Sequence, residues 1–204
     1  GIPLSNLREK NSPIKSGGYS SGALTYLKVV QSISDTVKSG GKSRRAANLT
    51  SFKVNHPDIL DYIECKEHNN LSAINISVLV PDWFMECVEQ KQFDTIVDLI
   101  SPNGNKKVGE LTVGKIWNAI VEHAHKTGDP GLLFYDESNR KNAFPSKGEI
   151  LSTNPCLPSW ALVLTHNGYR FFKDLDKSII INNTRHKCSN LIKTSDSEIV
   201  YEVI

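Results

Sequence analysis

The sequence predicts an α/β layer or barrel up to residue 155, followed by a small all-β segment. Segments with strand-like and helix-like patterns alternate along the first part, which is typical of α/β folds. Residues 72–80 form the most strand-like run, and their largely apolar composition suits a strand covered on both faces, as in a parallel sheet. After Cys156, only hairpin and short-strand patterns follow.

The first predicted elements are a loop and a helix. Residues 1–22 are loop-like, because serine and glycine supply turn chemistry there. A helix is expected over residues 23–39, and Gly40-Gly41 ends it. Its apolar face is predicted to carry Leu24, Leu27, Val30, Ile33 (or Ser34) and Val37.

Strands and helices then alternate from residue 49 to residue 135. The predicted strands cover residues 49–54, 72–80 and 132–135, with a short strand or hairpin at 93–100. Helices are predicted to begin at His56-Pro57-Asp58, at Pro81-Asp82 and, for residues 113–126, after Thr112, since proline suits a first turn and threonine caps a helix. The residues expected to face inward on the first and last of these helices are Ile59, Leu60, Ile63, Ile116, Trp117, Ile120 and Val121. Gly128 ends the last helix, and residues 136–142 are expected to be a polar loop.

The all-β segment is predicted from a hairpin and two further strands. Residues 161–165 and 169–172 flank the turn His166-Asn167-Gly168, and Asn-Gly is the strongest short hairpin signal. Residues 178–181 and 199–204 are the other expected strands.

Composition and charge exclude several classes of protein. The 24 Lys and Arg against 22 Asp and Glu give a net charge of +2, which favours neither a nucleic-acid partner nor an acidic tail. No apolar run approaches the ~20 residues that span a bilayer. The spacing of Cys65, Cys87, Cys156 and Cys188 predicts neither a disulfide framework nor a metal site, and suits a reducing cytoplasm. The chain begins and ends in the middle of a pattern, so we expect it to be a fragment.

Several motifs of residues 1–155 follow one another in a characteristic order. They are Leu4-Ser5-Asn6-Leu7-Arg8 with Gly17-Gly18, residues 37–48, Val54-Asn55-His56-Pro57-Asp58-Ile59, Asn75-Ile76-Ser77-Val78, residues 128–139, and Thr153-Asn154-Pro155-Cys156. This ordered set resembles the catalytic large subunit of ribonucleotide reductase. The first two motifs are similar to that family's two specificity loops, of which the second is rich in glycine and arginine.

The resemblance implies a ten-stranded α/β barrel that reduces ribonucleotides to deoxyribonucleotides by radical chemistry. In that family a cysteine thiyl radical removes hydrogen from the ribose 3′ carbon, and two other cysteines supply electrons. Asn154 would contact the substrate ribose. The residues implied to contact a substrate or effector nucleotide are Gly40, Gly41, Lys42, Ser43, Arg44, Arg45 and Asn48.

The resemblance also implies a cofactor and partners. The Asp-Pro-Gly and Asn-Pro-Cys spellings favour the adenosylcobalamin-dependent class, although diiron-dependent relatives carry similar strings and leave the radical generator open. The implied partners are a ribonucleotide substrate, a deoxynucleotide or ATP effector, a thioredoxin-type reductant and, when the protein is complete, a second copy of the chain. Neither nucleic acid, a membrane nor a metal ion is implied.

At Cys156 the sequence departs from the reductase pattern. Pro158 stands where the family's Asn-Xaa-Cys-Xaa-Glu motif has glutamate, and barrel patterns stop. The segment from Cys156 through residue 175 instead resembles the first block of an intein. Cys156 would then attack the carbonyl of Pro155 and form a thioester. The implied domains are a partial reductase barrel, residues 1–155, and the start of an intein (Hint) domain, residues 156–204.

Two other interpretations remain. In the first, the protein is a divergent reductase without an intein, and Cys156 is the radical cysteine. In the second, it is a non-enzymatic nucleotide-binding module built on the loop at residues 40–45. A further expectation is that the chain alone has no reductase activity, because it lacks the electron-donating cysteine pair, the glutamate that flanks the radical cysteine and the later barrel strands.

Overall fold

The computed structural model describes two compact units. The first contains residues 1–37 and 48–153. In the second, the described residues are 156–158, 162–165, 168–171, 178–181, 184–187, 191–193 and 200–203. Within these ranges, no helix combines the length and the apolar character needed to cross a membrane.

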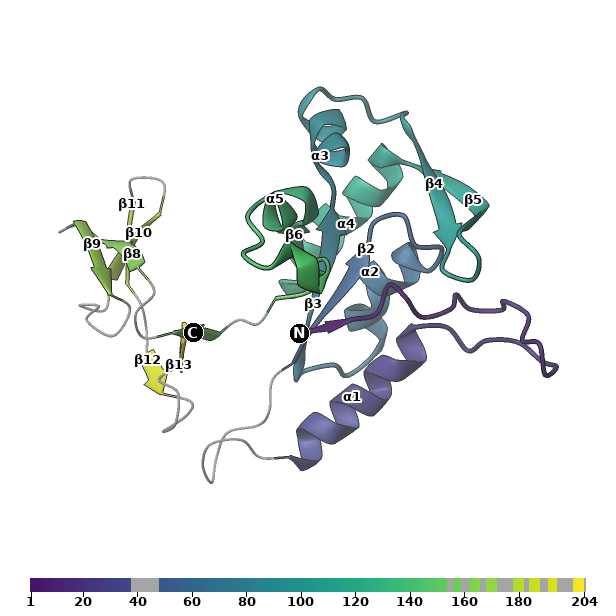
Figure 1. The fold of residues 1–204 in the computed structure, drawn as a ribbon, viewed down its shortest axis with the longest axis horizontal. Helices are drawn as coiled ribbons and strands as arrows, with labels where there is room; N and C mark the ends of the chain where they lie inside the picture. Colours follow the sequence, from purple (N-terminus) through teal and green to yellow (C-terminus); the bar gives the residue numbers. More distant parts are fainter. Residues whose placement is uncertain are drawn as a thin grey trace. The chain divides into compact units, whose positions relative to one another are not determined.

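The first unit is built on a four-stranded parallel sheet (Figure 1). Its strands, in spatial order, are β1 (Ile2–Pro3), β2 (Asn48–Lys53), β3 (Ile74–Val80) and β6 (Gly131–Phe134). Each pair of neighbours is parallel. The spatial order of the strands is also their order in the chain, so each crossover leads to the next strand in the same direction. This winding is the one found in α/β barrels, and it confirms the predicted α/β class.

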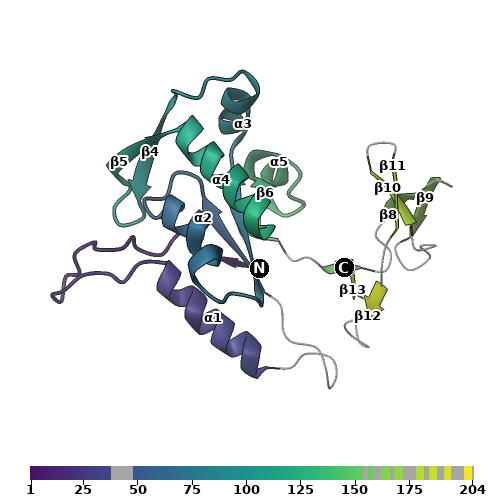
Figure 2. The same ribbon diagram turned by 180° about the vertical axis from the view of Figure 1, so that it is seen from behind.

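The crossovers consist mainly of helices. Their bounds are α1 (Leu24–Thr36), α2 (Ile59–His68), α3 (Asp82–Glu89) and α4 (Val113–Thr127), and α5 (Tyr135–Arg140) follows the last strand. A short 3₁₀ turn, η1, covers Pro145–Lys147. Figure 2 shows α2 and α4 side by side over one face of the sheet. Thr112 caps α4 as predicted, because its Oγ1 accepts a hydrogen bond from the backbone N–H of Lys115 at 3.2 Å.

The core lies between this face of the sheet and the helices. Side chains of a strand alternate between its two faces. Phe52 on β2 therefore points toward α2, where its ring stacks on that of Tyr62 with 4.5 Å between centroids. The Tyr62 hydroxyl donates to the Thr50 carbonyl at 2.8 Å and accepts from the N–H of Ser77 at 3.2 Å, so it joins β2 to β3. Burial raises the pKa of this phenol and keeps it protonated.

On the opposite face of the sheet, one level has only small side chains or none. Ser51, Ser77 and Gly131 stand in register on β2, β3 and β6. We call the face that bears these three residues the small-residue face. A Cβ atom on Gly131 would lie 3.3 Å from the Ser77 hydroxyl, which is a tight contact.

A two-stranded antiparallel hairpin is inserted between α3 and α4. Its strands are β4 (Ile96–Ser101) and β5 (Lys106–Thr112). The N–H of Ile100 donates to the carbonyl of Asn55 at 2.9 Å, and this bond ties the hairpin to the segment that follows β2. A strand or hairpin was predicted near β4, but β5 was not predicted.

The described strands of the second unit are all short. They are β7 (Cys156–Pro158), β8 (Leu162–Thr165), β9 (Gly168–Phe171), β10 (Ser178–Ile181), β11 (Thr184–Lys187), β12 (Leu191–Lys193) and β13 (Val200–Val203). The pairs β8–β9, β10–β11, β12–β13 and β13–β7 are antiparallel. The hairpin predicted around residue 167 is thus present, although its turn lies outside the described residues.

The predicted inner face of α1 was partly wrong. Ile33 and Val37 are exposed and Gln31 is buried, whereas Ser34, the alternative to Ile33, is buried as predicted. These polar side chains are paired: Gln31 Oε1 accepts from the N–H of Ala73 at 3.0 Å, and Ser34 Oγ donates to the Val30 carbonyl at 2.8 Å. Because a buried polar group with a partner costs little, the pairs decide which face turns inward.

Two predictions about α4 and the segment after β6 also need correction. Val121 was expected inside but is exposed, and His123 on the same helix is buried with its Nδ1 3.0 Å from a Glu67 carboxylate oxygen. The polar loop expected after the last strand begins instead with α5. Arg140 holds this short helix through ion pairs with Asp82, at 2.6 Å, and with Glu137.

Candidate functional site

The carboxyl ends of the four parallel strands meet at one edge of the sheet, where α/β barrels place their active sites. Two cavities open there and share Lys53 and Asn55. One, of about 190 Å³, is also lined by Val54, Leu79, Pro81, Trp83 and Tyr135. The other, of about 290 Å³, is also lined by Ser5, Asn6, His56, Ile100, Pro102 and Asn105. We call this pair of cavities the carboxyl-edge site.

Lys53 and Tyr135 give the first cavity its charge and its hydrogen-bonding groups. The Lys53 ammonium lies 5.4 Å from the centre of the Tyr135 ring, within the range of a cation–π contact. Burial, with a smaller contribution from a hydrogen bond to Glu149, raises the pKa of Tyr135 to about 12. The site therefore presents a protonated phenol and a primary amine, which suit recognition of an anionic or hydroxylated ligand.

The loop after β1 is held against the start of α2 by two side chains. His56 Nε2 lies 3.0 Å from the carbonyl of Leu7, and its Nδ1 accepts a hydrogen bond from the N–H of Asp58 at 3.0 Å. The ring is therefore neutral, with its proton on Nε2. Asp58 in turn accepts from the N–H of Lys10 at 3.1 and 3.2 Å. These bonds fix one wall of the second cavity.

The buried, neutral ring of His56 predicts that the protein is less stable in mild acid. Burial lowers the pKa of His56 below its usual value of 6.5, against smaller opposing effects of the Leu7 carbonyl, Asp58 and Glu9. As the pH falls below 6.5, the unfolded chain takes up the proton first, so the stability that the neutral ring contributes is lost as the pH falls through the folded pKa. We expect unfolding in urea to show a lower midpoint at pH 5 than at pH 7.

A His56→Asn variant serves as the test, and its midpoint should change less between these two pH values. Asp58 acts in the opposite sense, since burial raises its pKa above 3.8 and its protonation therefore favours the folded state. An equal pH dependence in wild type and variant would contradict the assignment to His56.

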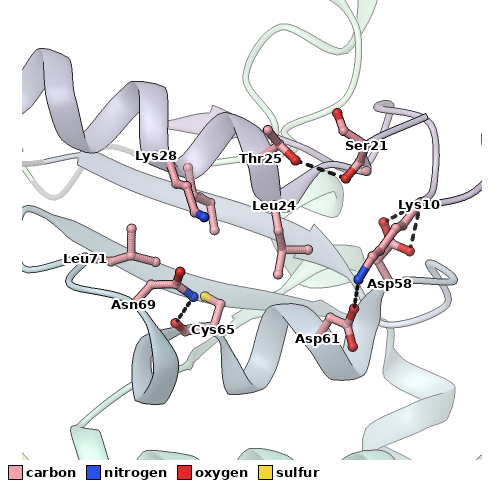
Figure 3. Close-up of a pocket in the computed structure, with 12 residues that line it drawn as sticks. Lys10, Ser21, Leu24, Thr25, Lys28, Asp58, Asp61, Cys65, Asn69 and Leu71 are labelled. Carbon is pink, nitrogen blue, oxygen red and sulfur yellow. Dashed lines mark hydrogen bonds and ion pairs between the residues drawn. The ribbon is translucent and has the colours of Figure 1, made fainter. Parts of the chain in front are cut away.

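A third cavity, of about 240 Å³, lies between α1 and α2, away from the carboxyl edge (Figure 3). Figure 3 shows Lys10 bridging Asp58 and Asp61 at its rim, and Cys65 at its base. Burial raises the pKa of the Cys65 thiol to about 12, so it remains a thiol. Cys65 and Cys87 are both buried.

The chain that leads to residue 154 crosses the small-residue face. The hydroxyl of Ser51 donates to the carbonyl of Leu151 at 2.5 Å. A Cβ on Gly1 would lie 2.2 Å from the Thr153 carbonyl oxygen, so residues 152–153 pass directly against the start of β1. The first unit thus ends on the face of the sheet that α2 and α4 do not cover.

Comparison with known proteins gives this architecture a family. A sequence model described as "Ribonucleotide reductase, barrel domain" matches residues 1–160. The chain belongs to this family. The resemblance inferred from the ordered motifs is thereby confirmed at the level of the family.

Named relatives point to the same reductases. The chain is 42% identical over 159 residues to a vitamin B12-dependent ribonucleoside-diphosphate reductase of Thermoplasma acidophilum, and 36% identical over 159 residues to one of Mycobacterium tuberculosis. Both matches cover 76% of this chain but only 20% and 22% of those proteins. A ribonucleoside-diphosphate reductase large subunit of Invertebrate iridescent virus 6 is 28% identical over 198 residues, covering 90% of this chain and 20% of its own length. The chain therefore spans about one fifth of the reductases it matches.

The structure describes only some of the residues that were predicted to act in catalysis or nucleotide binding. Asn154, Pro155 and residues 40–45 lie outside the described residues, and Cys156 begins β7. Asn48 starts β2 at the edge opposite the carboxyl-edge site, and its side-chain amide donates to Ser34 Oγ at 2.5 Å. The structure therefore does not bring the predicted set together within the described residues.

Sequence reasoning missed Lys53, Tyr135 and Asn139. The first two are the last residue of β2 and the first after β6, and a signal for both was their place at the carboxyl ends of strands that read as parallel. No comparable signal marks Asn139, which lies within a polar segment.

Proposed function

We propose that the complete protein is the catalytic large subunit of a ribonucleotide reductase, which converts ribonucleotides to deoxyribonucleotides by thiyl-radical chemistry in a ten-stranded barrel. The observation that carries this proposal is the family match across residues 1–160. The singly wound parallel sheet and the cavities at its carboxyl edge support it, since that edge is where a barrel enzyme binds its substrate.

Adenosylcobalamin is the proposed radical generator, because the two B12-dependent reductases are similar over 76% of this chain. When bound, it would supply the radical that the cysteine thiyl carries. A corrinoid exceeds the drug-sized ligands that fill pockets of roughly 300–1,000 Å³. The two cavities of the carboxyl-edge site, at about 190 and 290 Å³, do not fit it, so no described residue is assigned to the cofactor.

The reductase test uses the complete protein with ribonucleoside diphosphates and triphosphates, a dithiol reductant, and adenosylcobalamin present or withheld. We expect deoxynucleotide only when the cobalamin is added. Formation of deoxynucleotide without cobalamin would remove the cofactor proposal, and no product under any condition would remove the reductase proposal. The 204-residue chain should be inactive in the same assay.

We further propose that an intein begins at Cys156. The short antiparallel strands of residues 156–203, the pairing of β7 with β13 and proline at position 158 support a separate β unit from this point. The Cys156 thiol would add to the Pro155 carbonyl carbon. The C–N bond then breaks, a C–S bond forms, and the freed α-amino group of Cys156 takes the proton.

This step predicts cleavage of the unspliced protein by a small thiol. A thiol in solution should release a fragment that ends at Pro155, detected by its mass. Cys156→Ala should abolish the release, while Cys188→Ala, at the other cysteine of the second unit, should not. If wild type and Cys156→Ala behave alike, the intein proposal fails, and the intein-free reductase with Cys156 as radical residue takes its place.

A second copy of the chain is the proposed partner of α1. Four of its large apolar side chains, or of those just after it, are exposed at helical spacing: Tyr26, Val29, Ile33 and Val37. Such a stripe suits packing against another helix. Sedimentation of the complete protein should give a dimer. The nucleotide effector and the thioredoxin-type reductant stay proposals that follow from the family.

A further inference from the structure

Two of the four residues before Asn154, Ile150 and Leu151, are held by side chains from other elements of the first unit. Asn139, in the last turn of α5, accepts the N–H of Ile150 on its Oδ1 at 2.7 Å and donates from Nδ2 to the Ile150 carbonyl at 3.1 Å. The Ser51 hydroxyl holds the next carbonyl, that of Leu151, at 2.5 Å. Three hydrogen bonds therefore fall on two consecutive residues.

The amide of Asn139 behaves as a strand partner for Ile150. It exchanges a donor and an acceptor with one backbone residue, as the two residues of a hydrogen-bonded antiparallel pair do. Its Nδ2 also donates to the Tyr135 carbonyl at 2.9 Å, so the amide is itself fixed to the first turn of α5. Because α5 follows β6 without a break, Ile150 is placed relative to the parallel sheet. Aspartate at 139 would lose both donations, and alanine would lose every bond.

Loop closure does not explain Asn139. The turn between α5 and Ile150 is already closed by a second asparagine, Asn142, whose Nδ2 donates to the Gly148 carbonyl at 2.9 Å and whose Oδ1 accepts the N–H of Phe144 at 2.9 Å. The two asparagines make the same kinds of bond, one within the turn and one beyond it. Asn142 makes its bonds within the turn, whereas Asn139 bonds to Ile150, after the turn has ended.

The sheet surface below this chain is shaped to admit it. Because Ser51, Ser77 and Gly131 have small side chains or none, the chain can pass close to the backbone of the sheet. Residues 152–153 lie against the backbone of Gly1. A larger side chain at Ser51 would occupy the place of the Leu151 carbonyl. The chain that precedes Asn154 is therefore fixed by β6 through α5, by β2, and by the start of β1.

We infer that Asn139 and Ser51 are positioning residues for the segment 150–153, which leads into the residues proposed to react. This inference rests on the proposed reductase function, and it applies whether the reacting cysteine is Cys156 or the one joined to Pro155 after splicing. A reacting group displaced by about 1 Å can lose roughly a hundredfold in rate. Fixing Ile150 and Leu151 limits the positions that the chain can take when it enters the reactive residues.

The first test measures the hydrogen bonds between Asn139 and Ile150 and requires no enzyme activity. Amide hydrogen exchange is compared among wild type, Asn139→Ala and the matched control Asn142→Ala, in the 204-residue chain. We expect exchange at Ile150 to be about tenfold faster in Asn139→Ala, from the loss of a net hydrogen bond, with the amides of β2 and β3 unchanged. Asn142→Ala should leave Ile150 at the wild-type rate. Equal exchange at Ile150 in all three proteins would overturn the inference.

The second test measures positioning in the complete, spliced enzyme. We expect Asn139→Ala to lower kcat about tenfold or more with KM for the nucleotide unchanged, Ser51→Ala to lower it less, and Asn142→Ala to leave it as in wild type. Asn139→Asp keeps the acceptor for the Ile150 N–H and should fall between alanine and wild type. A kcat of Asn139→Ala within twofold of wild type would overturn the positioning role. If wild type itself made no deoxynucleotide, the proposed function would fail, while the exchange result would stand on its own.

Discussion

Replacing Phe52 by alanine is expected to lower the free energy of unfolding by about 3–5 kcal/mol. Phe52 is fully buried, and its ring lies 4.5 Å from that of Tyr62 and 4.3 Å from that of His56, measured between centroids. Truncation removes apolar surface from the core and leaves a cavity between β2 and α2, which the strands cannot close without breaking their register. Urea unfolding followed by circular dichroism measures the loss.

The matched control is Phe144→Ala. Phe144 is 70% exposed, so its removal should change the free energy by no more than about 0.5 kcal/mol. A loss below about 1 kcal/mol for Phe52→Ala would mean that β2 is not the centre of the core. The Phe52 variant should also weaken the hydrogen bonds of His56 with Leu7 and Asp58, because the rings of Phe52 and His56 are in contact.

Replacing Lys66 by methionine is expected to cost about 2–4 kcal/mol, because it leaves a buried carboxylate without its counter-ion. Lys66 on α2 lies 3.0 Å from Asp129, and the two side chains are only 15% and 17% exposed. Asp129 also accepts the N–H of Ile76 at 3.2 Å, so it cannot turn away without leaving that donor unpaired. The pair joins α2 to the chain that enters β6.

Two further variants separate the charge from the packing. Lys66→Met combined with Asp129→Asn should recover much of the loss, since the neutral amide still accepts from Ile76 and carries no charge. Lys126→Met breaks a comparable but exposed pair with Glu122, which is 2.8 Å long, and should leave the urea midpoint unchanged. A double variant as unstable as the single one would show that the lysine stem, not its charge, is what matters.

The fold of the first unit was largely predictable because its strands and helices carry strong apolar patterns. Residues 72–80 are largely apolar, and Thr112 and Gly128 mark both ends of α4. Prediction failed where tertiary partners outweigh pattern. Gln31 is buried and Val37 is not, because the side chain of Gln31 accepts a hydrogen bond from the backbone N–H of Ala73.

The same reason accounts for the elements that were not predicted. The β5 strand and α5 are polar and lack a continuous apolar face, so periodicity does not distinguish them from loops. They are held by contacts with residues far along the chain, such as the ion pair of Arg140 with Asp82.

The candidate site was predictable only in part. Ordered motifs were enough to find the family, because each is short and local. The carboxyl-edge site was missed because Lys53 and Tyr135 are 82 positions apart in the chain. The strand order that brings them together cannot be predicted from the local sequence around either residue. Asn139 was missed for a similar reason, since its role depends on the turn that returns the chain to it.

The bond from Ser51 to Leu151 joins residues 100 positions apart in the chain. Contacts of such long range form late in folding, because the entropy of closing the loop is recovered only after the intervening elements are in place. The approach to Asn154 is therefore expected to become ordered last, once β2, β3 and β6 have assembled.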